Sequence, residues 1–253
     1  MTSEGGAGDV EVAGGGKGGS AAGGSSGGMS STGGTDGVAG SSAGSAGAAG
    51  TAGSAGATST GATLLISEVK TRGVAGGSDE FVELYNPGST AVSFDNTWTL
   101  RARAAIVNTC SSGVYSTRFV GKGQSIPGHG HFLITGAGYA GSVTADGALT
   151  IAITDGGSIV LTHGAQTVDA VCYAFDGATK AEISGCNKYE CEDPPLSNLP
   201  HNNNGGPISN TDSSLERKPG GGAGNAQDTD KNELDFSAAT PTTPQNTDSA
   251  KVP

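Results

Sequence analysis

Residues 228–235, DTDKNELD, have the side-chain spacing of a cation site. Oxygen-bearing side chains recur on alternate residues and at the end of the run, at Asp228, Asp230, Asn232 and Asp235. Carboxylate and amide oxygens at such spacing are the ligands that calcium loops provide. The run has no glycine at its sixth position and no glutamate at its twelfth, which excludes an EF-hand. Two interpretations stay open: a looser calcium site, and a solvated loop whose Asp and Asn side chains hold a turn.

Two glutamates and one arginine could form a buried ion pair. Glu68 and Glu83 alternate with apolar residues in runs typical of strands, on the same side as Ile66 and Phe81 respectively. A carboxylate that faces the interior needs a partner, and Arg217 in SLER can provide a bidentate one. We therefore expect a structural ion pair. The alternative is acid–base chemistry by the two carboxylates, which would need a cleft and a further polar group.

Two histidines in the run PGHGHF, His129 and His131, could offer two imidazoles to one metal ion. With Asp228 and Asp230 they would form the ligands of a metal-dependent hydrolase, which is the catalytic alternative. No Asp, Glu or Cys stands within a few residues of the pair. We therefore expect ordinary turn histidines, and neither a cofactor nor an enzyme.

Two glycine-rich stretches match enzyme motifs by spacing alone. The run HFLITGAGYAG, residues 131–141, contains G-x-G-x-x-G, but a short turn and the apolar run LTIAIT follow it where a dinucleotide-binding fold needs a helix. The run GSSAG, residues 40–44, contains G-x-S-x-G, but no strand precedes it and no helix follows it. We expect neither stretch to bind a nucleotide or to act as a nucleophile.

Four cysteines predict disulfides. They are Cys110, Cys172, Cys186 and Cys191. An even number of cysteines permits three pairings, of which we expect Cys186 with Cys191 and Cys110 with Cys172. A zinc site is the less favoured alternative, because C-x4-C lacks the tight spacing of zinc ligands.

Composition divides the chain into two parts. Residues 1–62 contain about half of the 46 glycines, most of the rest being Ser, Ala and Thr, and have no aromatic, Leu or Ile. Such a segment cannot bury enough apolar surface to offset the entropy of ordering its backbone, so we expect a disordered linker that tethers the rest. The net charge of -11 argues against a nucleic-acid partner.

Hydropathy and the cysteines together predict an exported protein. No apolar run approaches the length of a membrane span, and MTSEGGAGDV has no apolar signal core. We expect a protein of the extracellular space or cell surface whose export signal has been removed.

Beyond residue 63 the sequence is typical of short strands. Runs rich in Val, Ile, Leu, Thr and aromatic residues alternate with Gly, Pro, Asn and Asp, at 64–70, 80–86, 97–103, 131–135, 149–154, 158–163 and 167–173. Several short strands at turn-like spacing predict an all-β sandwich or barrel. Trp98 is expected in the core between the sheets.

The order of several motifs resembles a known family. They are ISEV (66–69), DEFVELYNP (79–87), WTL (98–100), SIPGHGHFLI (125–134), GGSIVL (156–161), VDAVCY (168–173), SLERK (214–218), NELDF (232–236) and TPTTPQN (240–246). In this order they resemble a lamin tail domain of the bacterial type. The resemblance implies an immunoglobulin-like β-sandwich over residues 63–246, followed by a tail at 247–253. It also implies an accessory module of exported proteins rather than a catalyst.

Two inserts depart from that family's pattern, at residues 104–124 and 176–213. Loops on a rigid scaffold are where binding residues concentrate. The sequence therefore predicts a non-catalytic structural or interaction module that binds a protein or surface polymer through these loops. A metal-dependent hydrolase and a calcium-stabilised adhesion module are the alternatives.

Overall fold

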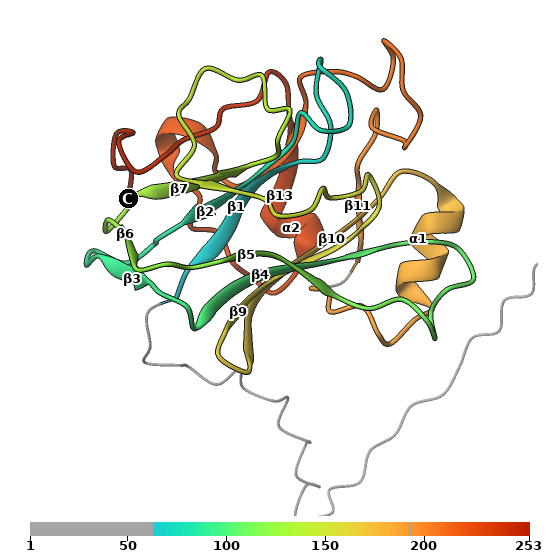
Figure 1. The fold of residues 1–253 in the computed structure, drawn as a ribbon, viewed down its shortest axis with the longest axis horizontal. Helices are drawn as coiled ribbons and strands as arrows, with labels where there is room; N and C mark the ends of the chain where they lie inside the picture. Colours follow the sequence, from blue (N-terminus) through green and yellow to red (C-terminus); the bar gives the residue numbers. More distant parts are fainter. Residues whose placement is uncertain (1–62, 193) are drawn as a thin grey trace, which may run out of the picture. The chain divides into compact units, whose positions relative to one another are not determined.

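The computed structural model describes residues 63–192 and 194–253. The expected linker, residues 1–62, and the motif at 40–44 lie outside the described residues. Within the described ranges the protein is mainly β, as predicted, with two short α-helices (Figure 1). No helix of these residues is long and apolar enough to cross a membrane.

The larger sheet has six strands. In spatial order they are β13 (Phe236–Ala239), β12 (Ser214–Arg217), β1 (Leu65–Lys70), β2 (Phe81–Tyr85), β7 (His131–Thr135) and β8 (Gly147–Ala148). Neighbouring strands are antiparallel except for the short parallel pair β7 and β8. Because β1 lies next to both β2 and β12, the sheet brings residues near 68, 83 and 216 side by side.

The second sheet has five strands and carries both inserts. In spatial order they are β11 (Leu196–Ser197), β10 (Gln166–Ala174), β9 (Gly157–His163), β4 (Trp98–Ala104) and β5 (Ser116–Val120). The remaining elements are the hairpin of β3 (Val92–Phe94) with β6 (Gln124–Ile126), the helices α1 (Gly177–Ser184) and α2 (Asn232–Asp235), and a 3-10 turn at Gly221–Ala223. The first insert therefore connects β4 to β5, and the second follows β10.

The main hydrophobic core lies between the two large sheets. Ile66, Val82 and Leu84 of the first sheet pack with Leu161 and Val171 of the second, and all five are fully buried. Trp98 belongs to the same core, as predicted. Alternation along each strand thus places one row of apolar side chains between the sheets, which is the arrangement of a β-sandwich.

One predicted strand is wrong. Residues 149–154, LTIAIT, form no strand, although they are rich in β-branched residues. The Leu149 amide donates to Thr135 on β7, and the next amide, that of Thr150, donates to Arg118 on β5. The segment therefore crosses from one sheet to the other and cannot continue pairing with either. The glycine loop at residues 136–141 likewise leads into no helix, as expected.

The last residues of the chain, expected to form a tail, lie against the first sheet. The Val252 carbonyl accepts from the Tyr85 hydroxyl at 2.7 Å, and its amide donates to His129 at 2.9 Å. Further back, the Thr247 hydroxyl donates to Asp146. The segment after β13 therefore covers the outer face of the six-stranded sheet.

Candidate functional site

The two inserts are joined by a disulfide. Cys110 of the first insert is bonded to Cys186 of the second, and Cys172 on β10 is bonded to Cys191. Both expected pairings, Cys186 with Cys191 and Cys110 with Cys172, are wrong. After α1 the chain runs back along the outer face of the second sheet, where the Ser158 hydroxyl donates to Glu190 at 2.7 Å. This path carries Cys191 to β10 and leaves Cys186 beside the first insert.

The disulfides also indicate the cellular compartment of the protein. Disulfides persist in oxidising surroundings, so they indicate an extracytoplasmic environment. Each bond ties an insert either to the other insert or to the sheet, which restrains loops that would otherwise move.

Arg103 on β4 holds both inserts at their bases. This buried guanidinium donates to the carbonyl of Cys110 at 2.8 Å and to that of Lys188 at 3.0 Å. It also stacks on the ring of Tyr189, 4.3 Å from its centroid. The Tyr189 hydroxyl in turn donates to the carbonyl of Ala104 at 3.1 Å. One charged side chain thus connects segments about 80 residues apart without leaving any of these carbonyls unpaired.

Further contacts complete one compact unit, which we call the insert lobe and define as residues 105–115 and 177–192. Its helix α1 is capped at the N-terminus by Asp176, whose side chain accepts from the Thr179 amide at 2.7 Å. The Asn108 amide donates to Glu182 on that helix at 2.8 Å. Beneath the lobe lies a small second core, formed by Ala105, Cys172, Ala174, Ile183, Cys186 and Tyr189.

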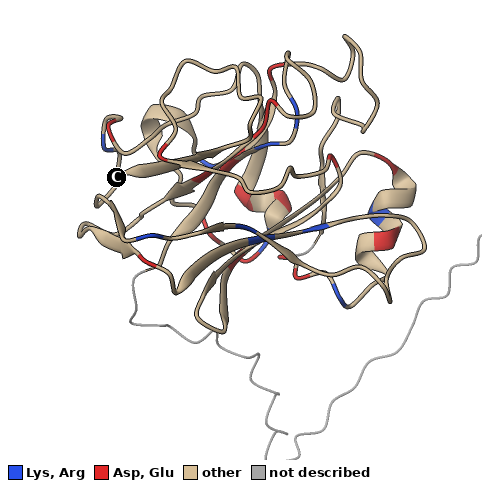
Figure 2. Cartoon of the chain, in the orientation of Figure 1, with Lys and Arg blue, Asp and Glu red and all other residues tan. Residues whose placement is uncertain are grey.

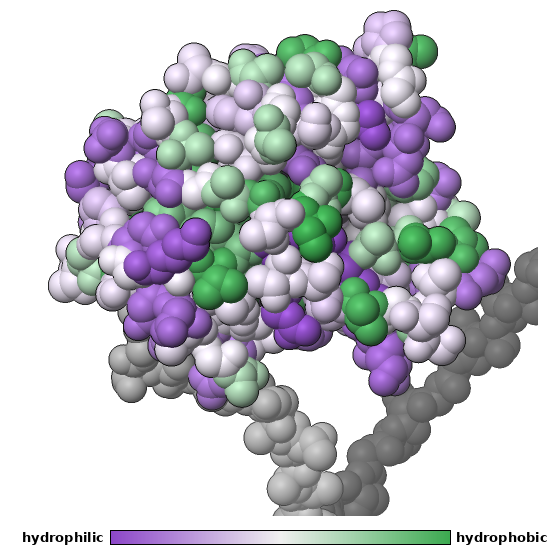
Figure 3. Space-filling view, viewed as in Figure 1, coloured by the Kyte–Doolittle hydropathy of each residue, from purple (hydrophilic) through white to green (hydrophobic). Residues whose placement is uncertain are grey.

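The insert lobe has exposed apolar groups on its first insert and a cavity on its second. Ile106, Val107 and Val114 are 60%, 45% and 76% exposed. A cavity of about 330 Å³ opens on the second insert, lined by Ile183, Gly185, Cys186, Asn187, Tyr189 and Pro195. Figure 3 shows apolar groups on the side of the molecule where α1 lies in Figure 1, together with others spread across the same face. The cavity walls are therefore fixed by a helix, a disulfide and an aromatic ring.

The rest of the second insert is held by a buried polar network around Asp155. This carboxylate accepts from Thr71 at 2.7 Å, from Arg72 at 2.8 Å and from the Asn203 amide at 2.6 Å. The Asn198 side chain donates to Thr71 and to the Asp155 carbonyl. Residues 198–203 are therefore fixed to the sandwich, and the side chains that fix them are not free to bind a ligand.

Arg217 is fully buried between the sheets, but its partner differs from the one expected. Its guanidinium makes two hydrogen bonds of 2.7 Å to Asp169 on β10, and its Nε donates to Ile66 at 2.9 Å. The pairing with Glu68 or Glu83 is wrong. A β-bulge between Ile66 and Glu68 turns Glu68 to the outer face of the sheet, whereas Arg217 faces inward.

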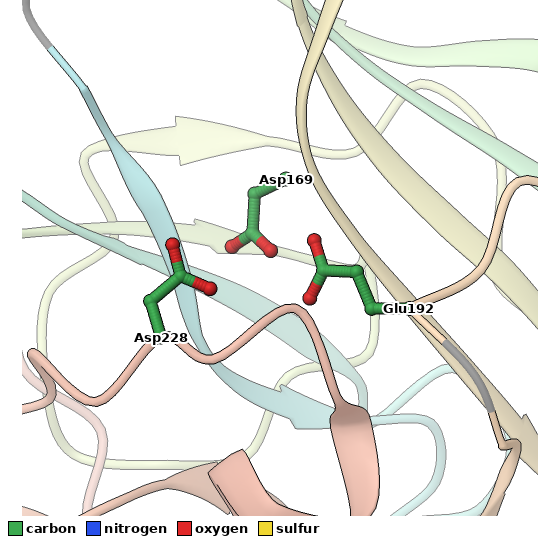
Figure 4. Close-up of side chains that lie close together, drawn as sticks. All are labelled: Asp169, Glu192 and Asp228. Carbon is green, nitrogen blue, oxygen red and sulfur yellow. The ribbon is translucent and has the colours of Figure 1, made fainter. Parts of the chain in front are cut away.

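Three carboxylates meet beside this guanidinium. Oxygens of Asp169, Glu192 and Asp228 lie within 4.8 Å of one another, and Figure 4 shows the three side chains pointing toward a common point. Asp228 is 3.3 Å from Arg217. Burial, followed by the nearby charge of Asp169, raises the pKa of Glu192 to about 9. Glu192 is therefore protonated at neutral pH, and Arg217 supplies one positive charge to the other two carboxylates, Asp169 and Asp228.

The predicted calcium ligands are dispersed around this cluster. Only Asp228 of the four belongs to it. Asp235 is buried and accepts from Thr229 and Lys231, which gives it the role of a turn-holding side chain. Asp230 is exposed with a φ of 55°. Sequence reasoning missed Asp169 and Glu192, although an aspartate inside the apolar run TVDAVCY was a usable signal.

The two predicted histidines occupy separate environments. His131 is buried against Tyr85, with ring centroids 4.8 Å apart, and its Nε2 lies 2.9 Å from Asn225. His129 sits in a turn with a φ of 55°. Among the described residues, neither belongs to a group of three side chains that could hold a metal.

Glu68 and Glu83 form another buried cluster, on the outer face of the six-stranded sheet. Glu68 accepts from Ser214 and from the Thr243 amide, while Glu83 accepts from Ser67 and from the Gln245 amide. Burial raises the pKa of Glu68 to about 7, and burial followed by the charge of Glu68 raises that of Glu83. These carboxyls serve to fasten the C-terminal segment to the sheet.

Comparisons with known proteins identify no family. No family model matches the chain, and no curated protein matches it. One similar solved structure is a crystal structure of a DUF4876 family protein from Bacteroides thetaiotaomicron VPI-5482. The two chains share 12% identity with a TM-score of 0.41, over 76% of this chain and 74% of the other.

Proposed function

We propose that this chain is a non-catalytic interaction module of the cell surface or extracellular space, which binds a protein or surface polymer through the insert lobe. The resemblance of its motif order to lamin tail domains supports an accessory module of this kind. The two disulfides support an oxidising compartment.

One observation carries the proposal: two inserts from distant parts of the chain meet in a single cross-linked lobe with apolar groups on its surface. Ile106, Val107 and Val114 expose apolar surface on the same lobe, which a binding partner would cover. The bond between Cys110 and Cys186 restrains both inserts before any partner arrives. A restrained loop loses little entropy on binding, which favours affinity.

The distribution of charged residues is compatible with a contact surface that is apolar at its centre and polar at its edge. Basic residues are few, and several lie along β4 and β5, whereas acidic residues gather around α2 (Figure 2). The cavity itself is lined by Tyr189, Pro195 and Ile183 together with polar Asn187. Aromatic and apolar walls with a few polar groups are typical of binding sites for polypeptide side chains or sugar rings.

Surface retention tests the proposal with matched variants. The labelled full chain is added to the cells that export it, and bound label is compared for the wild type, for a double variant Ile106→Ser with Val114→Ser, and for Ile151→Ser. Ile151 is also exposed but lies outside the insert lobe. We expect the lobe variant to lose at least about ten-fold in retention and Ile151→Ser to lose nothing. Equal retention of all three chains would overturn the proposal.

A further inference from the structure

Lys70 and Asp79 form an enclosed pair at the end of the six-stranded sheet. Lys70 is the last residue of β1, and Asp79 lies shortly before β2 on the far side of the connecting loop. The Lys70 Nζ lies 3.2 Å from Asp79 Oδ1, and the two side chains are only 4% and 0% exposed. An amine and a carboxyl are thus held in direct contact, with almost no exposure to bulk water.

The surroundings of the pair are apolar on one side. The rings of Phe81 and Tyr139 lie 5.7 Å and 5.9 Å from Lys70 Nζ, measured to their centroids. Gly73 permits the close approach, because a methyl carbon placed there would lie 2.5 Å from both the Lys70 Cε and the Asp79 Cγ. Two aromatic rings and the backbone of the connecting loop thus enclose the pair.

The Asp79 carboxyl is held by two backbone amides. Ala140 donates to Oδ1 at 3.1 Å, and Ala75 donates to Oδ2 at 3.2 Å. Amide donors fixed in this way stabilise negative charge that develops on a carboxyl oxygen during attack at its carbon. The Asp79 carbon is therefore held in place beside the amine, with donors on both of its oxygens.

A third titratable side chain lies on the same face of β1 as Lys70. Glu68 lies two residues before Lys70 on β1 and faces the same side of the strand. Burial raises the pKa of its carboxyl to about 7. A carboxyl with that pKa can both donate and accept a proton near neutral pH.

We propose that Lys70 and Asp79 react to form an intramolecular amide. A proton passes from the ammonium to the carboxylate, and the Nζ lone pair then forms a bond to Asp79 Cγ. One carboxyl oxygen leaves as water, with Glu68 carrying a proton from the nitrogen to that oxygen. The ammonium and carboxylate thus become an amide and one water, and no oxidant or other co-reactant is consumed.

Asp79 is the reacting carboxyl rather than the other acid near the lysine. Asp212 Oδ1 is 3.5 Å from Lys70 Nζ, but its side chain is 42% exposed and accepts from Thr242. A partly exposed side chain is not held in one position against the amine, as the geometry of attack requires. A cavity of about 520 Å³ beside the pair, lined by Lys70, Asp79, Asp212 and Thr243, gives the released water a path outward.

Mass spectrometry of the full chain tests the amide directly. With both disulfides reduced, the wild type is expected to be about 18 Da, one water, below the mass of its sequence. Lys70→Arg, which keeps the positive charge, and Asp79→Ala are expected at their sequence masses. Asp212→Ala is the matched control and should keep the loss of water. In a tryptic digest, the bond after Lys70 should resist cleavage and residues 70 and 79 should occur in one branched peptide.

Several outcomes would overturn the assignment. A wild-type chain at its full sequence mass, cleaved normally after Lys70 in both fresh and aged samples, would show that the pair is only ionic. A lost water that maps to Asp212 would remove Asp79 from the reaction. Glu68→Gln should lower the linked fraction at a given time after refolding, and linkage as fast as in the wild type would remove Glu68 from the reaction.

Discussion

The six-stranded sheet buries acidic side chains on both of its faces, and the two faces do so differently. Neighbouring residues of β12 belong to the two clusters, since Glu216 lies opposite Glu68 on the outer face and Arg217 points inward to Asp169. On the inner face the Arg217 guanidinium pairs with Asp169 and lies close to Asp228. On the outer face the partners of Glu68 and Glu83 are hydroxyls and backbone amides.

The difference shows that a carboxyl can be buried either against a cation or against neutral donors. Asp169 accepts two short bonds from Arg217, which form a charge-assisted pair. Glu83 lies 3.7 Å from His131, whose pKa is lowered by burial, so that this imidazole is neutral at ordinary pH. Without a cation beside it, the raised pKa of Glu83 keeps a proton on the outer cluster.

Removing the guanidinium should have the largest effect on stability. Arg217→Met is expected to lower the free energy of unfolding by about 3–5 kcal/mol, because Asp169 would remain buried without a partner. Chemical denaturation measures the loss. Arg101→Met is the matched control, since Arg101 stacks on Tyr115 at the surface and its loss should cost under about 1 kcal/mol. An unchanged Arg217→Met chain would contradict the importance of the inner pair.

The stability that the outer cluster contributes should fall as pH rises, because its carboxyls are buried in the protonated form. Burial raises the pKa of Glu83 in the folded state above its unfolded value of 4.5. Below pH 4.5 the contribution of the protonated carboxyl to stability is therefore fully present. That contribution is lost as pH rises through the folded pKa. Glu83→Gln imitates the protonated acid at every pH.

We therefore expect Glu83→Gln to match the wild type near pH 4 and to exceed its stability by on the order of 1 kcal/mol at pH 8. Unfolding in denaturant at several pH values measures this difference. The Asp169→Asn chain is the inner counterpart and should be less stable than the wild type at both pH values, since it loses an ionic partner of Arg217. A Glu83→Gln chain that is less stable at pH 8 would mean that the outer cluster is buried as ions.

The strands were predictable from the sequence to the extent that their side chains alternate. Residues 131–135 and 158–163 form β7 and β9 as expected, because both are apolar runs between turn residues. Residues 149–154 have the same composition but bridge the two sheets. Local propensity does not indicate which sheet accepts the hydrogen bond of each backbone amide. Composition alone could therefore not have prevented this error.

The candidate sites were predictable in residue type but not in pairing. Four cysteines in the folded part indicated disulfides, yet the pairing depends on the path of the chain after α1. Arg217 was correctly expected to need a carboxylate. Its partner was missed because a single bulge after Ile66 turns Glu68 outward, and one extra residue in a strand reverses the face of all that follow.

Of the changes considered, added calcium should have the smallest effect on stability. It tests whether the inner cluster binds a cation. Asp169, Glu192 and Asp228 offer oxygens close together, but Arg217 already supplies positive charge there. We expect millimolar calcium, compared with chelator, to shift the melting temperature of the full chain by less than about 1 °C. Asp228→Asn should change stability by less than about 1 kcal/mol, since its ion pair is partly exposed. Asp230→Asn is the matched control from the same loop. A clear calcium-dependent rise that disappears in Asp228→Asn and persists in Asp230→Asn would show that the cluster binds a cation alongside Arg217, and would favour a calcium-stabilised adhesion module.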